Sequence, residues 1–291
     1  MRHLLSAKGS GTAPEASALP VGAPPARRPA TGAMKPGHYR LRHVARMEWI
    51  KLRSLRSTWW TLGITVCGAT AMAVVIGINT RNAGGDLTNN ALAGIVPGLL
   101  LTGVLGVLMM TSEYTSGMIR ATLAAAPRRG LVLAAKGGVF GIVALAAGEA
   151  AAFISFVAGG AALRHGIAAP ALTQPGVLRA VLLAGASFSL VGLLGLGLGA
   201  VVRHTAAAIA VLVGGAYVAA QFVGAVAPGA AGYMPVLIIG NSLTTTKPEN
   251  CAPHAALCPH FLPVWAGLGM LCLYAAVVLG IGGWLLARRD A

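Results

Sequence analysis

The chain has 291 residues, of which 56% are hydrophobic and only 10% are charged, and its mean hydropathy is +0.74. A soluble domain of this size carries about 25% charged residues, so the composition excludes an ordinary soluble fold and indicates a membrane protein. The formal net charge is +15. Because the basic residues lie at the edges of apolar runs, this charge predicts contact with a membrane surface and no nucleic-acid partner.

The first 38 residues are rich in Pro, Ala, Gly and Ser and contain no apolar run long enough for the core of a signal peptide. We expect residues 1–38 to form a disordered cytoplasmic tail. Residues 39–291 are then expected to form one transmembrane domain.

Residues 39–57 are predicted to form an amphipathic helix that lies in the membrane interface, because apolar side chains recur at helical spacing between flanking arginines. Glu48 falls inside the apolar arc, where a carboxylate facing acyl chains is costly. Two interpretations are open. Either this face packs on protein with a cation near Glu48, or Glu48 snorkels or pairs with Lys51 or Arg53 in solvent. The candidate site residues of this helix are Glu48, Trp49, Lys51, Arg53 and Arg56.

Six apolar runs are long enough to cross roughly 30 Å of hydrocarbon at about 1.5 Å per residue. The predicted spans are residues 59–78, 91–111, 137–160, 180–202, 206–227 and 264–287. The expected fold class is therefore an all-α membrane protein with six transmembrane helices, an N-terminal interfacial helix and a short cytoplasmic helix.

The placement of the 22 Lys and Arg residues predicts the orientation. All of them lie in the tail, the interfacial helix, the loops after spans two and four or the C-terminus, except Arg81, Arg164, Arg179 and Lys247. By the positive-inside rule, both termini are expected in the cytoplasm and the protein in the plasma membrane.

Glu149 is the only carboxylate within the predicted spans. Such a group is a functional candidate, so we treat Glu149 as a candidate substrate or proton contact. A neutral acid that hydrogen-bonds to a neighbouring helix, or one close enough to a membrane face to reach water, is the alternative.

Small and sulfur-containing residues also occur inside the spans. Gly195 and Gly199 form a GxxxG pair that favours close helix packing, with a general glycine bias in composition as the alternative. Cys67 and Cys272 lie inside apolar runs and are predicted to be core residues.

The long segment before the last span contains a short apolar stretch, residues 233–240, that cannot span and either dips into the outer leaflet or packs on the bundle. Cys251 and Cys258 follow on the oxidising side and are a candidate disulfide. Free thiols, or a metal site with His254 and His260, are the alternatives. We assign no metal.

The polar stretch 112–129 separates spans two and three. Ser116 is suited to cap a short helix and Pro127 to end it. Glu113 is expected near Arg120, an ion pair that would fix the angle of this helix. Either the stretch is a lever that meets another protein, or it is an ordinary basic loop that only sets topology.

These residues carry a family resemblance. The loop EYTSGMIRATLAAAPRR resembles the E-Y-x-x-G-x-x-R-x-x-L-x-x-x-P-R motif of ABC-2 type permeases, the membrane subunits of ABC exporters. The run EWIKLRSLRSTWWTL is similar to the start of these subunits, and the ending LLARRDA resembles theirs. The similarity covers residues 40–291, with Met118 standing where Thr is common.

The resemblance implies that residues 116–127 form a coupling helix that docks in a groove of a cytoplasmic ABC ATPase subunit. It also implies that the interfacial helix lies along the inner leaflet, and that the segment after span five is a re-entrant outer element. Two permease subunits, identical or paired, and two ATPase subunits would form the transporter. The residues implied to couple to the ATPase are Glu113, Ser116, Gly117, Arg120, Leu123, Pro127 and Arg128.

The chain has no G-x-x-x-x-G-K-[ST] phosphate loop. ATP and Mg²⁺ are therefore expected on the partner ATPase, and this chain is expected to bind no cofactor and to be no enzyme. The predicted function is a permease subunit of an exporter for an apolar or amphipathic substrate, such as a drug, a peptide antibiotic or a lipid-like molecule. The alternatives are an ion-coupled secondary transporter, for which Glu149 alone offers an intramembrane charge, or a non-transporting sensory or immunity subunit.

Overall fold

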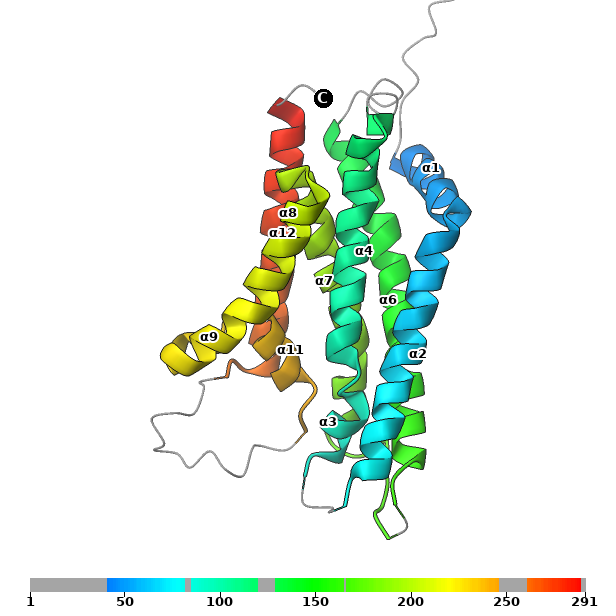
Figure 1. The fold of residues 1–291 in the computed structure, drawn as a ribbon, viewed down its shortest axis with the longest axis vertical. Coiled ribbons are helices and arrows are strands. Elements are labelled where there is room, and N and C mark those ends of the chain that lie inside the picture. Colours follow the sequence, from blue (N-terminus) through cyan, green and yellow to red (C-terminus); the bar gives the residue numbers. More distant parts are fainter. Residues whose placement is uncertain (1–40, 82–84, 120–128, 165, 246–260, 289–291) are drawn as a thin grey trace, which may run out of the picture. The chain divides into compact units, whose positions relative to one another are not determined.

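The computed structural model describes residues 41–81, 85–119, 129–164, 166–245 and 261–288. These residues are helical with connecting turns, without a β-strand among them, and they contain six helices long and apolar enough to cross a membrane. The prediction of an all-α membrane protein is confirmed at this level, whereas the predicted tail (1–38) lies outside the described residues. The six candidate spans are α2 (Arg56–Asn79), α3 with α4 (Leu87–Leu92 and Ile95–Thr115), α6 (Arg129–Ala161), α7 (Val177–Val202), the segment Thr205–Val226 and α12 (Val264–Arg288), as Figure 1 shows.

Among the helix boundaries that differ from the sequence predictions, three lie next to charged residues. The first helix, α1 (Leu41–Ser54), ends at an extended Leu55, so Arg56, predicted to belong to the interfacial helix, is instead the first residue of α2. Helix α4 continues through Thr115, and α6 already begins at Arg129. Charged residues interrupt the apolar runs in the sequence, but α4 continues through Glu113 and α6 through Lys136, and these two charges are paired with each other.

Helices α4 and α7 pack backbone to backbone at the centre of the bundle. A Cβ at Gly195 of α7 would lie 2.1 Å from the carbonyl oxygen of Gly103, and one at Gly106 of α4 would lie 2.1 Å from that of Gly192. Only glycine permits this approach, which brings the helix backbones together without a hydrophobic driving force. The close-packing interpretation of Gly195 is therefore confirmed.

The fifth span is interrupted by a π-helical turn. It consists of α8 (Thr205–Val213), the π-helix η1 (Gly214–Val218) and α9 (Ala219–Val226). Ala208 and Leu212 of α8 pack on Val107 of α4. Helix α9 instead packs on η1 and the short helices that follow it, and Figure 1 shows it directed away from α4. The π-turn, a known cause of helix bending, lies where these directions part.

Both cysteines within the spans face outward. Cys67 of α2 and Cys272 of α12 are exposed, so the prediction that they are core residues was wrong. Each lies on the side of its helix that the other spans leave uncovered. Lipid accepts an apolar side chain as well as a protein core does, so hydropathy alone does not separate the two positions.

The predicted outer element after α9 comprises α10 (Pro228–Ala231) and α11 (Pro235–Ser242). Ile238 and Ile239 of α11 are buried in the main core cluster. Gly267 of α12 makes room for this packing, because a Cβ there would lie 2.8 Å from Cγ2 of Ile238. The interpretation that residues 233–240 pack on the bundle is thus confirmed.

Asp86 connects α3 to the end of this outer element. Its Oδ1 accepts hydrogen bonds from the amides of Thr88 (3.1 Å) and Asn89 (3.0 Å), which caps α3, and from Oγ1 of Thr245 (3.0 Å). Its Oδ2 accepts the amide N–H of Thr245. Nearby, Arg179 of α7 donates to the carbonyl oxygen of Thr244 (3.1 Å).

We expect Asp86→Ala to lower the free energy of unfolding by about 1–2 kcal/mol, because it removes a helix cap and the bonds to Thr245 together. Asp86→Asn keeps the Oδ1 acceptor, so its free energy of unfolding should fall by less than that of Asp86→Ala. Thermal unfolding of the three proteins in one detergent measures both effects. An alanine variant as stable as the unchanged protein would contradict the assigned role.

Candidate functional site

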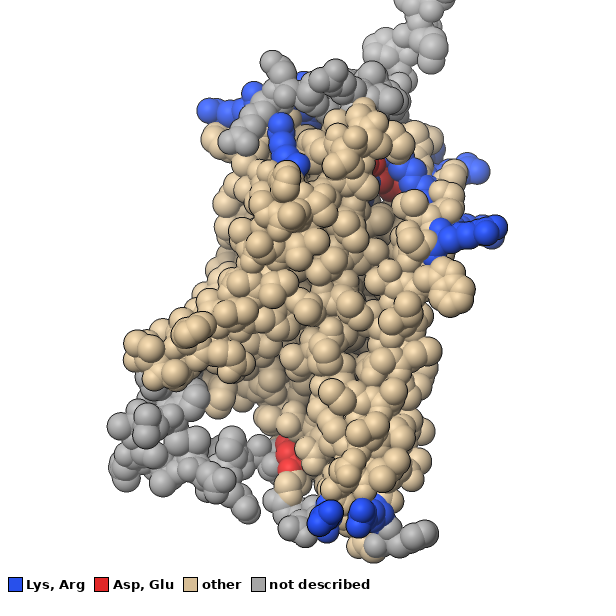
Figure 2. Space-filling view, viewed as in Figure 1, with Lys and Arg blue, Asp and Glu red and all other residues tan. Residues whose placement is uncertain are grey.

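The end of the bundle at the top of Figure 1 brings together α1, the last turn of α4, the start of α6 and the last turns of α7 and α12. We call it the basic end. The Lys and Arg side chains described there, seen in part in Figure 2, are Arg42, Arg46, Lys51, Arg53, Arg56, Arg129, Lys136, Arg203 and Arg288. The opposite end carries Arg81, Arg164 and Arg179 among the residues described.

Four charged side chains from three helices meet at the basic end; we call them the charge cluster. Lys136 of α6 lies 2.6 Å from Oε2 of Glu48 and 2.9 Å from Oε1 of Glu113. Lys51 of α1 lies 3.0 Å from Oε1 of Glu48 and 3.0 Å from Oε1 of Glu113. Acids and bases alternate around a closed ring, and their formal charges cancel.

Three members of the charge cluster are almost fully buried. The exposed fractions are 2% for Glu48, 4% for Glu113 and 3% for Lys136. Isolated charges at such burial would cost several kcal/mol each, so each depends on its partners. Lys51 is partly exposed. Burial acts to lower the pKa of Lys51, but its hydrogen bonds to Glu48 and Glu113 and their negative charges outweigh burial and raise it.

The helical repeat of α1 explains how Glu48 reaches this position. Val44 and Leu52 lie one turn before and after Glu48 on the same face, and both are buried. Val44 packs on Ala135 of α6 and on Val132, which lies one turn before Lys136. The interpretation that this face packs on protein with a cation near Glu48 is confirmed. Trp49 and Arg53, also predicted as site residues, lie on the exposed part of α1.

Lys136 was not among the predicted site residues. In the sequence it stands just before the apolar run taken as span three, where a lysine suits a membrane boundary equally well. The sequence nevertheless indicated that such a residue exists, because a carboxylate at position 48 in an apolar arc requires a nearby cation. Glu113 was predicted beside Arg120, which lies outside the described residues; its partners in the described part are Lys51 and Lys136.

The predicted coupling segment begins where α4 ends. Ser116 donates to the carbonyl oxygen of Ser112 (2.7 Å) and accepts, at a long 3.5 Å, from the amide of Met118, the direction expected of a helix cap. Gly117 follows with φ +69°, a left-handed conformation that commonly ends a helix at glycine. Arg120, Leu123, Pro127 and Arg128 lie outside the described residues, so the coupling helix stays a prediction.

A second contact holds the end of α4. Arg203 places its guanidinium over the ring of Tyr114, 5.2 Å from the centroid. Arg203 ends α7 with φ +58°, a conformation unusual for a residue other than glycine. The last turn of α4 is therefore joined to α1 and α6 through Glu113 and to the α7–α8 turn through Tyr114.

Glu149 lies far from the charge cluster, against α7. A Cβ at Gly185 would be 2.4 Å from the carboxyl carbon of Glu149, so the absence of a side chain at Gly185 leaves the space that this carboxyl occupies. Its Oε2 is buried and has no hydrogen-bond partner in the part of the chain that the structure describes. The role of Glu149 as a substrate or proton contact stays a prediction.

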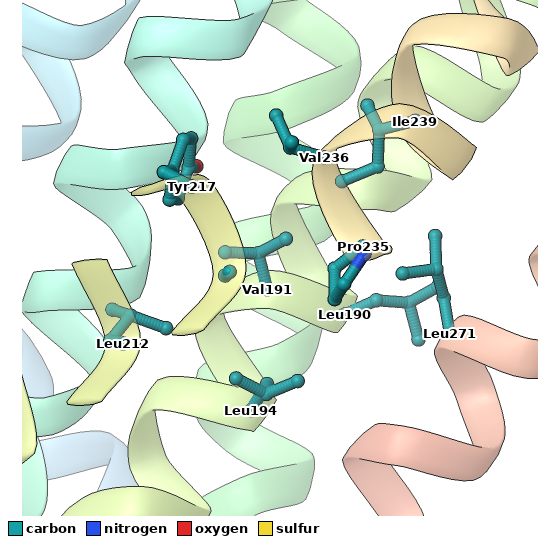
Figure 3. Close-up of a pocket in the computed structure, with 10 residues that line it drawn as sticks. Leu190, Val191, Leu194, Leu212, Tyr217, Pro235, Val236, Ile239 and Leu271 are labelled. Carbon is teal, nitrogen blue, oxygen red and sulfur yellow. The ribbon is translucent and has the colours of Figure 1, made fainter. Parts of the chain in front are cut away.

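An apolar hollow lies where the outer element meets the bundle (Figure 3). Side chains nearly fill it, since only about 10 Å³ is wide enough for the centre of a water molecule, and Tyr217 of η1 supplies the one phenol ring in its wall. The other lining residues are Leu190, Val191, Leu194, Leu212, Ala216, Pro235, Val236, Ile239 and Leu271. The predicted disulfide between Cys251 and Cys258, and the alternative metal site with His254 and His260, lie outside the described residues.

No protein-family model matches the chain, and a search of curated proteins found no match. The family assignment therefore rests on the motif residues quoted above and remains a prediction. What the chain shows by itself is a six-span helical membrane protein with a buried, neutral charge cluster at its basic end.

Proposed function

We propose that the chain is the permease subunit of an ATP-driven ABC-2 type exporter. In this proposal two permease subunits form the path in the plasma membrane, and the basic end faces the cytoplasm. Two separate ATPase subunits bind ATP and Mg²⁺ and supply the energy. The permease changes conformation and makes or breaks no covalent bond.

The observation that carries the proposal is the position of the charge cluster. Residues 116–127 connect α4 to α6, and Glu113 and Lys136 lie on these two helices. Their 2.9 Å ion pair joins the helices that flank the segment, and Glu48 and Lys51 add α1 to the same cluster. A protein that pulls on the segment would therefore move α1, α4 and α6 together, as rigid-body gating requires.

The proposed substrate class follows from the side chains inside the helical bundle. The described ion pairs all lie at the basic end, and the hollow of Figure 3 is apolar apart from Tyr217. Such surroundings favour an apolar or amphipathic substrate over an ion. An ion-coupled transporter usually carries charged or polar groups at a midplane site, and Glu149 alone would have to serve there.

The coupling role predicts that Gly117→Trp abolishes ATP-dependent transport and lowers co-purification with the ATPase at least tenfold. Gly117 has positive φ and no atom within 4 Å of a Cβ, so tryptophan would project from the surface that the ATPase would occupy. Transport into proteoliposomes and pull-down of the partner ATPase are the two measurements.

The matched control is Gly166→Trp at the opposite end of the bundle. Gly166 also has positive φ (+94°) and open space around a Cβ, so backbone strain is comparable in the two variants. Only the Gly117 variant should lose the ATPase. If both variants bind the ATPase and transport equally well, residues 116–127 do not form the contact.

A further inference from the structure

A groove on the surface between α6 and α12 begins at the basic end. About 470 Å³ of it is wide enough for the centre of a water molecule, and the groove is open to the surroundings. We call it the glycine groove; its lining residues are Gly130, Leu133, Ala134, Gly137, Gly138, Leu193, Leu279, Gly280 and Gly283. All nine are apolar, so the groove offers no hydrogen-bonding side chain to a ligand.

The glycine groove is hollow because the helices lack side chains there. A Cβ at Gly130, Gly138 or Gly280 would meet no atom within 4 Å. From Gly130 to Gly138 the groove follows α6 for about 12 Å at the helical rise. It is therefore an open apolar groove that extends along α6, and such a surface suits a hydrocarbon chain; we call its apolar length the apolar channel.

Two arginines stand where this groove reaches the basic end. Arg129 precedes Gly130 and donates from Nη1 to the carbonyl oxygen of Leu286 on α12 (3.1 Å). Arg288 places its guanidinium over the ring of Trp284, 4.6 Å from the centroid. A guanidinium stacked on an indole keeps the N–H groups at its edge directed outward, which suits bidentate binding of a phosphate.

The surroundings fit the level of lipid headgroups. Trp284 is exposed, and tryptophan favours the membrane–water interface. Basic pockets between transmembrane helices are recognised sites for anionic lipid headgroups. Charge and shape thus agree: cations at the mouth suit an anion, and the apolar channel below suits a chain attached to it.

We propose that the glycine groove is a binding site for one anionic phospholipid, with an acyl chain along Gly130, Gly138 and Gly280 and its phosphate on Arg288 beside Arg129. The site does not depend on the proposed transport function. A helix of a second copy would fill the apolar channel but would bring no anion to the arginines, so the charge favours lipid.

The test uses the full-length protein, reconstituted in nanodiscs that contain equal amounts of phosphatidylcholine and phosphatidylglycerol and then released for native mass spectrometry. We expect one phosphatidylglycerol to be retained in preference to phosphatidylcholine. Gly138→Leu and Gly280→Leu should each abolish retention by filling the channel. Arg288→Gln should reduce the preference about fivefold, since one arginine near a membrane surface contributes about that much.

Matched controls separate this site from general lipid adhesion. Gly269→Leu places the same side chain on α12 at another glycine with open space around a Cβ. Arg164→Gln removes an arginine that, like Arg129, donates to a helix carbonyl, here that of Ile78 at the opposite end. Both controls should retain phosphatidylglycerol as the unchanged protein does.

Three results would overturn the proposal. One is equal retention of phosphatidylglycerol by the groove variants and their controls. Another is equal retention of the two phospholipids by the unchanged protein. The third is a dimer without retained lipid in which cysteines introduced at Gly138 and Gly280 cross-link between copies, because the groove would then hold a second chain.

Discussion

Lys136→Met is expected to lower the free energy of unfolding by about 3–5 kcal/mol, the range found when one partner of a buried ion pair is removed. The substitution leaves the buried carboxylates of Glu48 and Glu113 with Lys51 as their one remaining partner in the charge cluster. Their mutual repulsion should also release α1 from α6. Thermal unfolding in detergent measures the first effect, and limited proteolysis in α1 measures the second.

The matched control removes the charges together. In the triple variant Glu48→Gln, Glu113→Gln and Lys136→Met, no buried ion is left without a partner, and the partly exposed Lys51 reaches water. Replacing a whole buried ion pair is often close to neutral, so this variant should recover most of the lost stability. A single variant within about 0.5 kcal/mol of the unchanged protein, the usual range for surface substitutions, would show that the charge cluster does not hold α1.

Gly195→Ala should be the second most damaging change, although it adds one methyl group. That methyl would lie 2.1 Å from the carbonyl oxygen of Gly103, and the obstacle is backbone that no rotamer change relieves. Helices α4 and α7 would have to separate, at a cost of about 3 kcal/mol, the upper part of the range for overpacked cores. Gly106→Ala should behave alike, because its methyl would meet the carbonyl oxygen of Gly192.

Gly63→Ala is the control for these variants. Gly63 lies in α2, and a Cβ there meets no atom within 4 Å. Its substitution should therefore leave stability unchanged or raise it slightly, since alanine is the better helix former. Unfolding temperatures in one detergent compare the three variants. If all three variants unfold at the same temperature, helices α4 and α7 do not pack as closely as described.

The spans could be predicted from the sequence because lipid imposes one strong requirement, an apolar helix of about 20 residues. The same requirement does not distinguish lipid-facing from buried positions. Cys67 and Cys272 were misplaced for that reason, since both surroundings accept a thiol. The GxxxG spacing left close packing and a general glycine bias open at Gly195; the structure shows close packing, on Gly103, a partner that could not be predicted from the sequence.

The sequence indicated the buried carboxylate of the charge cluster but not its partners. The position of Glu48 in an apolar arc indicated a buried carboxylate that needed a cation. Which cation it was depended on packing, because Glu48 and Lys136 stand 88 residues apart in the chain and Lys51 and Glu113 stand 62 apart. Local spacing carries no information on such pairs. For this reason the sequence suggests Arg120, seven residues from Glu113, as its partner, and does not indicate Lys51 or Lys136.

The separation of Glu113 and Lys136 by only 23 residues has a consequence for biogenesis. The two side chains lie on consecutive spans, so they are able to neutralise each other as soon as those spans form a hairpin. The hairpin then enters the bilayer without an unpaired charge. Glu48, synthesised earlier on α1, has only Lys51 of its own helix as a partner until Lys136 leaves the ribosome. We therefore expect the docking of α1 to be complete only after α6 has been inserted, because Lys136 lies on α6.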